Sequence, residues 1–278
     1  MKLDLHCHST ASDGEYTPTE LVCKAKKKGL EIFSLTDHDS ISGLDEAYQA
    51  AMKQNVRFVP GIEISAQDFE EIHILGYNID YKDPFLAAAC EEFRKDRDRR
   101  GERICDYLKT HNMIIDMGEI KEIAGESIVG RPHFAKYMLD KGYISDRREA
   151  FDKYLDTPEF FEATKRKHPS LEESISFIKK SGGLAVLAHP GFINMSFEDL
   201  DKMTARLKAA GLDGIECFYS QHSDDQKKKF FELAQKYDLK ISCGSDFHGE
   251  SVKPNISLGM DFDERKYGKD FIVSIIVA

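Results

Sequence analysis

The chain begins with a cluster of side chains that bind metals. The stretch LDLHCHSTASDG contains His6, His8 and Asp13. His6 and His8 are two residues apart in a strand-like segment, so both side chains point to one face while Cys7 points to the other. Imidazole nitrogens combined with carboxylate oxygens suit zinc, iron or manganese, whereas carboxylates alone suit magnesium or calcium. The opening of the chain therefore predicts part of a transition-metal site.

The same residue types recur in SLTDHDS, PGIEIS, EEIHILGY, AVLAHPG and CGSDFHG. The candidate ligands are His6, His8, Asp13, His38, Glu63, His73, His189, Asp246 and His248. Each is a weak signal alone, because Asp13-Gly14 also reads as a turn, Asp246 as a helix cap and His73 as an ordinary core or surface residue. Burying them together without a metal would leave several charges unpaired, at roughly several kcal/mol each. The combination favours a metal cluster.

The elements that would position these residues alternate along the chain. Strand-like runs include KLDLHCHS, EIFSLTDHD, RFVPGIEIS and EEIHILGYNID, and later LAVLAHPG, LDGIECFYS and LKISCGSDFHG. Amphipathic helical segments, the first starting at Thr17-Pro18 and stopping at Gly29, separate most of them. Alternation predicts an α/β fold with parallel pairing, and about seven strands favour a closed or distorted barrel. Most candidate ligands lie at strand C-terminal ends, where functional residues of such folds gather.

The segment 83–168 has almost no strand signal. It predicts one long charged helix over 83–111 and shorter helices near 117–124, 132–141 and 146–155. We therefore expect a barrel formed by 1–82 and 169–278, with 83–168 as a helical insertion. The apolar tail DFIVSIIVA reads as a strand and has no predicted place in the barrel.

Composition narrows the class of protein. The 278 residues are 41 % hydrophobic, enough for a sizeable core, and the net charge of −10 argues against nonspecific nucleic-acid binding. No apolar run reaches the roughly 18 residues of a membrane span, and the N-terminus lacks the apolar region of a secretion signal. The six cysteines show no C-x-x-C spacing, which is typical of free thiols in a cytoplasmic protein.

The motifs H-x-H-S-x-x-S-D-G, T-D-H-D, G-x-E-I-S, H-I-L-G-Y, G-R-P-H-F-A, L-A-H-P and G-S-D-F-H occur in this order. Their order and content closely resemble the PHP (polymerase and histidinol phosphatase) family of metal-dependent phosphoesterases, over nearly the whole chain. The resemblance implies a distorted (β/α)7 barrel with an inserted helical subdomain that caps the active site. G-R-P-H-F-A in the insertion resembles the branch that includes 3′,5′-nucleoside bisphosphate phosphatases, AMP phosphatases and short-RNA 5′–3′ exonucleases.

The family pattern implies two to three divalent metal ions. The implied ligand sets are His6, His8, Glu63 and Asp246 for the first ion, Asp13, His38 and His248 for the second, and Glu63, His73 and His189 for the third. Many family members carry a histidine where this chain has Asp13. A carboxylate there makes the second site less selective for zinc, so manganese, iron and magnesium stay candidates beside it.

The resemblance implies hydrolysis of phosphate monoesters by metal-activated water, without a protein nucleophile. The expected substrate is a small phosphorylated nucleotide or a short 5′-phosphorylated RNA, with no membrane partner and no stable nucleic-acid partner. A phosphatase of another small phosphomonoester, such as histidinol phosphate, is the alternative enzyme. A metal-binding regulatory module without activity is the alternative from another class.

Four residues outside the metal ligands are candidates for supporting roles. Arg131 and His133 lie at a helix start in G-R-P-H-F-A, where the guanidinium could face a phosphate, or could be an ordinary surface arginine. His222 follows a strand and either touches substrate or lies in a solvated loop. Asp37 is expected to orient a ligand imidazole.

Overall fold

The computed structural model describes residues 1–66, 72–124, 129–165 and 169–276. The chain separates into two compact units, one of Met1–Cys90 with His168–Ala278 and one of Glu91–Lys167. The expected insertion, 83–168, overlaps the second unit over residues 91–167.

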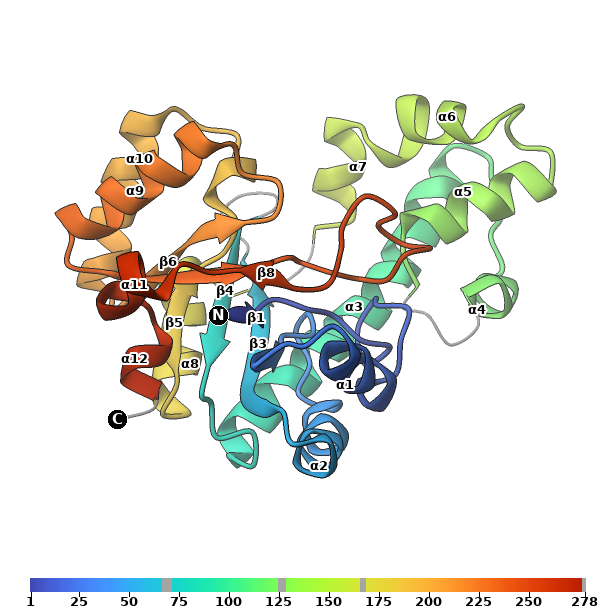
Figure 1. Ribbon diagram of the computed structural model, residues 1–278. Coiled ribbons are helices and arrows are strands. Elements are labelled where there is room, and N and C mark those ends of the chain that lie inside the picture. The colour runs from blue at the N-terminus through green and yellow to red at the C-terminus, as the bar shows by residue number, and fades with distance from the viewer. Residues whose placement is uncertain (67–71, 125–128, 166–168, 277–278) are drawn as a thin grey trace. The chain divides into compact units, whose positions relative to one another are not determined.

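The first unit is built on a single sheet (Figure 1). Its strands are β1 (Lys2–Asp4), β2 (Ile32–Leu35), β3 (Arg57–Ser65), β4 (His73–Tyr77), β5 (Leu184–Leu187), β6 (Gly214–Tyr219), β7 (Lys240–Gly244) and β8 (Met260–Asp261). They lie in the order β7-β6-β5-β4-β3-β2-β1-β8. The Leu5 N–H donates to the Cys243 carbonyl at 3.1 Å, which links the first strand to the seventh and closes a barrel. The predicted α/β barrel is confirmed.

The pairing within the barrel differs from the expectation at one strand. β4 runs antiparallel to both β3 and β5, while β1–β2, β2–β3, β5–β6 and β6–β7 are parallel. The expectation of parallel pairing is therefore wrong for β4. Only residues 66–72 separate it from β3, too few for the crossover helix that a parallel partner needs. β8, which pairs antiparallel with β1, is too short to leave a sequence pattern.

The helices of the first unit follow their sequence signals. They are α1 (Pro18–Lys27), α2 (Leu44–Gln54), α8 (Leu171–Lys180), α9 (Phe197–Ala209) and α10 (Asp224–Lys236), and α3 (Pro84–Thr110) starts in this unit. Thr17 and Glu20 form a capping box at the start of α1, and Gly29 follows its end with a φ of 74°. α1 and α2 pack side by side, and α10 packs on β6 and β7 (Figure 1). These helices bury Leu21, Leu44 and Phe230 in the core.

Up to residue 276, the last one described, the C-terminal tail is not a strand. A 3-10 turn, η3 (Gly268–Asp270), follows the short helix α11 (Glu264–Tyr267), and α12 (Val273–Ile276) comes after it. Phe271 and Ile272 are buried, and the Ile272 N–H donates to Ile241 in β7 at 2.9 Å. The apolar residues pack against β7 and the Phe262 ring. They do not extend the sheet, since a single isolated bridge, between Ile241 and Phe271, joins this segment to β7.

All the regular secondary structure in the described residues of the second unit is helical. It contains most of α3, then α4 (Met117–Ala124), α5 (Arg131–Asp140), α6 (Arg147–Ala150), the π-helix η1 (Phe151–Leu155) and α7 (Pro158–Ala163). Its own core includes Leu108, Ile120, Phe134, Met138 and Phe160. The sequence analysis missed α7, although Thr157 caps it and Pro158 occupies its first turn, both recognisable start signals. Across the described parts of the chain, every helix is too short or too polar to cross a membrane.

Candidate metal centre

Side chains from six strand ends meet at one end of the barrel. His6 and His8 follow β1, His38 follows β2, Glu63 lies in β3, His189 follows β5, and Asp246 and His248 follow β7. His73 starts β4 instead of ending it. Because β4 is antiparallel, its start lies beside the C-terminal part of β3, where His73 pairs with Ser65. The reversed strand thus brings one more imidazole to the same end.

Glu63 is the centre of this cluster and is fully buried. Its Oε2 lies 3.1 Å from His6 Nε2, 3.1 Å from His8 Nε2 and 3.2 Å from His38 Nδ1, and its Oε1 lies 2.9 Å from His73 Nδ1 and 3.0 Å from His189 Nε2. One carboxylate therefore faces five imidazoles from four other strand ends. That arrangement is the one a bridging ligand would have.

Three overlapping groups have ligand atoms within 4.8 Å of one another: His6, His8, Glu63 and Asp246; His8, Asp13, His38 and His248; and His38, Glu63 and His73. The first group has the composition of the first expected ligand set. The second contains the expected residues together with His8. In the third, His38 stands where His189 was expected, while His189 approaches Glu63 directly.

The electrostatics of the cluster leave its carboxylates ionised. Burial raises the pKa of Glu63, but His38, His6 and His73 lower it more, and the net pKa lies well below the usual range. Asp246 behaves in the same way, with burial opposed mainly by His6 and His8. Burial lowers the pKa of His38 to about 3, so this ring is neutral at physiological pH. Burial also lowers the pKa of His8, but Asp246 and Glu63 raise it more, to about 9, so this ring must release a proton when a metal binds. Ionised carboxylates and neutral imidazoles are the forms that bind metals.

Within the described part of the chain, several buried atoms of the cluster approach one another without a hydrogen bond of good geometry. They are His6 Nε2, both ring nitrogens of His8, His38 Nδ1, Glu63 Oε2 and His189 Nδ1. Buried polar atoms normally have partners, because each unmet group costs about 1–3 kcal/mol. Nitrogen and carboxylate oxygen atoms directed into one space are the donor set of zinc, iron or manganese. The residues fit a site for divalent metal ions.

Comparison with known proteins identifies the family of the chain. The model of the PHP domain matches residues 4–162. The chain belongs to the PHP family. It is 36 % identical over 248 residues to a 5′-3′ exoribonuclease of Haemophilus influenzae, covering 89 % of this chain and 90 % of the relative. It is also 36 % identical over 249 residues to a 3′,5′-nucleoside bisphosphate phosphatase of Chromobacterium violaceum, covering 88 % and 87 %.

Solved structures of PHP-like proteins share the whole fold. One, described as an amidohydrolase from Chromobacterium violaceum with bound sulfate and no metal, superposes with a TM-score of 0.77 at 32 % identity, covering 96 % of both chains. Another, described as a metal-dependent phosphoesterase from Bifidobacterium adolescentis, gives 0.74 at 29 % identity, covering 97 % of this chain and 96 % of the other. The expected family is confirmed.

In this PHP-family protein, the candidate ligands have partners that the sequence analysis missed. Glu216 is fully buried and accepts from His6 Nδ1 at 3.0 Å. Its sequence signal was a carboxylate inside the apolar strand GIECFY. The outer oxygen of Asp246, Oδ2, accepts from Tyr219 at 2.9 Å and from Lys253 at 2.7 Å. Lys253 left no signal, because nothing near it in sequence marks it as different from other lysines.

Asp37 does not have the neighbours that were expected. Its carboxylate accepts from the Ser9 N–H and hydroxyl, each at 2.7 Å, and from the Ser12 hydroxyl at 2.6 Å. Among the described residues these hydrogen bonds join it to the loop that links His8 to Asp13, not to an imidazole. Asp37 therefore orders the ligand loop through its backbone and serines.

The expectation that His222 touches substrate is not supported by its contacts. Its Nε2 accepts from the Gly191 N–H at 3.1 Å, and its Nδ1 donates to the Cys217 carbonyl at 3.1 Å. Burial lowers its pKa, which agrees with the neutral tautomer that these two contacts require. With both nitrogens engaged by backbone groups, His222 holds the turn after His189 in place.

Arg131 and His133 lie in the second unit, outside the three ligand groups. The guanidinium of Arg131 pairs with Asp156 at 2.7 Å and lies 5.3 Å from the centre of the Phe161 ring. His133 Nδ1 accepts from the Gly130 N–H at 2.9 Å and closes the first turn of α5. Burial lowers the pKa of His133. The phosphate-binding role expected for Arg131 remains a prediction.

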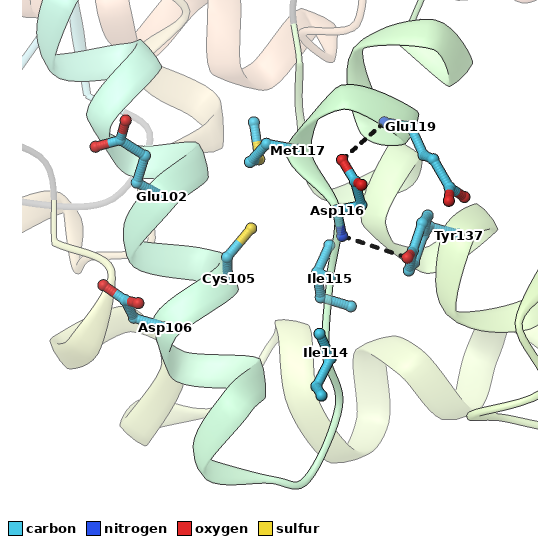
Figure 2. A pocket seen from close by; sticks show the side chains of 9 residues that line it. All are labelled: Glu102, Cys105, Asp106, Ile114, Ile115, Asp116, Met117, Glu119 and Tyr137. Carbon is cyan, nitrogen blue, oxygen red and sulfur yellow. Dashed lines mark hydrogen bonds between the residues drawn. The ribbon is translucent and has the colours of Figure 1, made fainter.

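The second unit also contains a pocket of about 660 Å³ (Figure 2). It is lined by Glu102, Cys105, Asp106, Ile114, Ile115, Asp116, Met117, Glu119 and Tyr137. Figure 2 shows the Asp116 carboxylate accepting from the Glu119 N–H, at 3.4 Å. Four carboxylates and no cationic lining residue make this pocket repulsive to phosphate groups, and none of the expected site residues lines it.

Proposed function

We propose that this PHP-family protein is a metal-dependent phosphoesterase that hydrolyses phosphate esters of small nucleotides or short RNA. The observation that carries the proposal is the cluster of nine ligand side chains around Glu63 at one end of the barrel. The relatives named as an exoribonuclease and a nucleoside bisphosphate phosphatase support the choice of substrate class.

Two or three divalent ions would be held by the nine residues, with Glu63 shared between sets. When bound, such ions neutralise charge on phosphoryl oxygens and lower the pKa of a coordinated water. The protein's part is to present ionised carboxylates and imidazole nitrogens in fixed positions. The side chains of Asp13, His38 and His73 are 46 %, 18 % and 20 % exposed, so the cluster is accessible on this side. A substrate phosphate would enter there.

The neighbouring hydroxyl and thiol groups do not favour a covalent phosphoenzyme. Ser9 and Ser12 both donate to Asp37. Cys7 is fully buried, and burial, reinforced by Asp4, raises its pKa well above the usual range. The two hydroxyl groups are engaged in ordering the loop through Asp37, and the raised pKa keeps Cys7 a thiol and not the nucleophilic thiolate. Transfer of the phosphoryl group to water is therefore the simpler route.

The helical segment 83–168 is proposed to cap this active site, with Arg131 as its phosphate-binding cation. The support is the motif G-R-P-H-F-A at the start of α5, where Arg131 is 32 % exposed and its present partner, Asp156, is a solvent-exposed carboxylate. Asp156 is bound through one contact, Arg131 Nη1 to Asp156 Oδ1, whereas a substrate phosphate could accept from the guanidinium in bidentate geometry and carries more charge.

The decisive experiment is phosphate release with added Mn²⁺ from four compounds: adenosine 3′,5′-bisphosphate, AMP, histidinol phosphate and a short 5′-phosphorylated RNA. We expect turnover of at least one nucleotide or RNA substrate and its loss with a chelator. Turnover of histidinol phosphate alone would place the protein in the other phosphatase class. Metal binding with no turnover of any compound would indicate a non-catalytic module and overturn the proposal.

A further inference from the structure

Strand β6 contributes none of the nine candidate ligands, yet Glu216 within the strand and His222 just after it contact segments that contain candidate ligands. We propose that Glu216 and His222 are positioning residues that together hold His6 and His189, so that β6 couples two of the metal-ligand sets. The inference rests on the proposed function, because it assumes that the cluster binds divalent ions.

Glu216 makes contacts that only a carboxylate satisfies. Its Oε1 lies 3.0 Å from His6 Nδ1, and its Oε2 accepts from the His189 backbone N–H at 2.8 Å. A carboxylate only accepts hydrogen bonds, so His6 carries its proton on Nδ1. With the Nδ1 proton held by Glu216, Nε2, which lies 3.1 Å from Glu63 Oε2, is the nitrogen left to bind a metal. Glu216 thereby fixes the tautomer that a metal ligand needs.

The turn at His189 is the second element that β6 holds. His189 has a φ of 23°, which is unusual for a residue with a side chain, and Pro190 has no N–H to tie the turn down. The N–H groups on either side, of His189 and Gly191, are bound by Glu216 and His222 respectively. A Cβ on Gly191 would lie 2.7 Å from His222 Cδ2, so the close approach requires glycine. The turn is thus fixed at both ends from β6 and the loop after it.

The consequence is a specific pattern of coupling. His6 belongs to the group with His8, Glu63 and Asp246, and His189 contacts Glu63 on its other oxygen. The group of Asp13, His38 and His248 has no contact with Glu216 among the described residues. Changing Glu216 should therefore weaken binding at the first and third sets and spare the second.

Glu216→Gln is the sharpest variant, because it keeps the volume and removes one acceptor. The amide oxygen can accept from only one of the two donors, His6 Nδ1 and the His189 backbone N–H. The other donor then faces the N–H groups of the glutamine amide at about hydrogen-bond distance. We expect metal affinity at the affected sites to fall by about 10- to 100-fold. His222→Phe removes both backbone contacts of the ring and should weaken only the ion that uses His189. Thr204→Val is the control, since it deletes a buried hydrogen bond, to the Leu200 carbonyl at 2.8 Å, on helix α9.

The measurement is competition of the full-length protein with a chromophoric chelator for Mn²⁺ and Zn²⁺, with bound metal counted by elemental analysis. Wild-type affinity at every site in both Glu216→Gln and His222→Phe would overturn the inference. Absence of metal binding by the wild type would instead refute the proposed function. Should Glu216→Gln fail to fold, the ring-nitrogen NMR signals of His6 in the zinc-loaded wild type decide. A proton on Nδ1 is expected, and a proton on Nε2 would overturn the role of Glu216.

Discussion

Replacing Glu63 tests whether one carboxylate bridges the metal centre. In Glu63→Gln, the side chain keeps its shape but loses its charge and one of its two acceptor oxygens. Glu63 contributes to two of the three ligand groups, whereas His73 contributes to only one. We therefore expect Glu63→Gln to weaken two ions and His73→Ala to weaken one.

The magnitude follows from the ligand count. A four-ligand zinc site has an apparent binding free energy of about 10–16 kcal/mol, or roughly 3–4 kcal/mol per ligand. Each 1.4 kcal/mol is about tenfold in dissociation constant. Loss of Glu63 should thus weaken each of two ions by about two to three decades. We expect Glu63→Gln to lose these ions in a dialysis during which the wild type keeps them.

The assay compares bound metal per chain, by elemental analysis, for wild type, Glu63→Gln, His73→Ala and the control His111→Ala. His111 lies in the second unit and hydrogen-bonds the Tyr107 carbonyl at 3.1 Å, outside all three ligand groups. We expect its metal content to equal that of the wild type. If Glu63→Gln keeps the wild-type metal content, or loses no more than His73→Ala, the bridging role is wrong.

Three further predictions use the same preparation. Removing metal with a chelator should abolish turnover and lower the melting temperature by several degrees. The reason is that ions present at a hundred times their dissociation constant stabilise the fold by about 2.7 kcal/mol. An unchanged melting curve would contradict a metal-filled centre. Arg131→Ala should lower kcat/KM by about ten- to a thousandfold, or about 1.4–4 kcal/mol, without loss of metal, whereas Asp156→Asn, which breaks the same exposed ion pair, should leave kcat/KM near wild type. Tyr219→Phe and Lys253→Met each remove one hydrogen-bond donor to Asp246, and each should weaken metal binding by about tenfold or more in chelator competition. A metal affinity equal to that of the wild type in both variants would show that one donor is enough to hold Asp246.

The sequence predicted the parts of the fold that repeat a local pattern. The seven main strands, the capped helix α1 and the charged helix α3 all carry signals within their own residues. The direction of β4 has no such signal in its own residues, because the direction in which two strands pair depends on the length of the segment that connects them and not on the composition of the strand. The prediction of a strand for the C-terminal tail was wrong for a related reason. Its apolar residues predict burial, but burial against β7 does not require strand pairing.

The candidate ligands could be listed from the sequence, because metal-binding side chains at strand ends are rare enough to notice. Their partners could not be listed in the same way. Glu216 was visible as a charge inside an apolar strand, yet its contacts with His6 and His189 depend on the closure of the barrel. Lys253 reaches Asp246 from a loop with no regular pattern. Contacts between distant segments require the fold before they can be assigned.

The charge balance explains why an acidic protein would need its metals to attract phosphate. The cluster contains three carboxylates, Asp13, Glu63 and Asp246, and neutral imidazoles add no charge once they bind metal. Without ions, His6 and His8 partly offset the three carboxylate charges, because burial lowers the pKa of both rings but neighbouring carboxylates raise it more. Once metals bind, these rings are neutral ligands. Two dications then exceed the three carboxylates, and a third leaves a clear positive excess in a partly buried site where charges are weakly screened. The metals would therefore make the site positive in a chain whose net charge is −10, so substrate binding as well as turnover should depend on them.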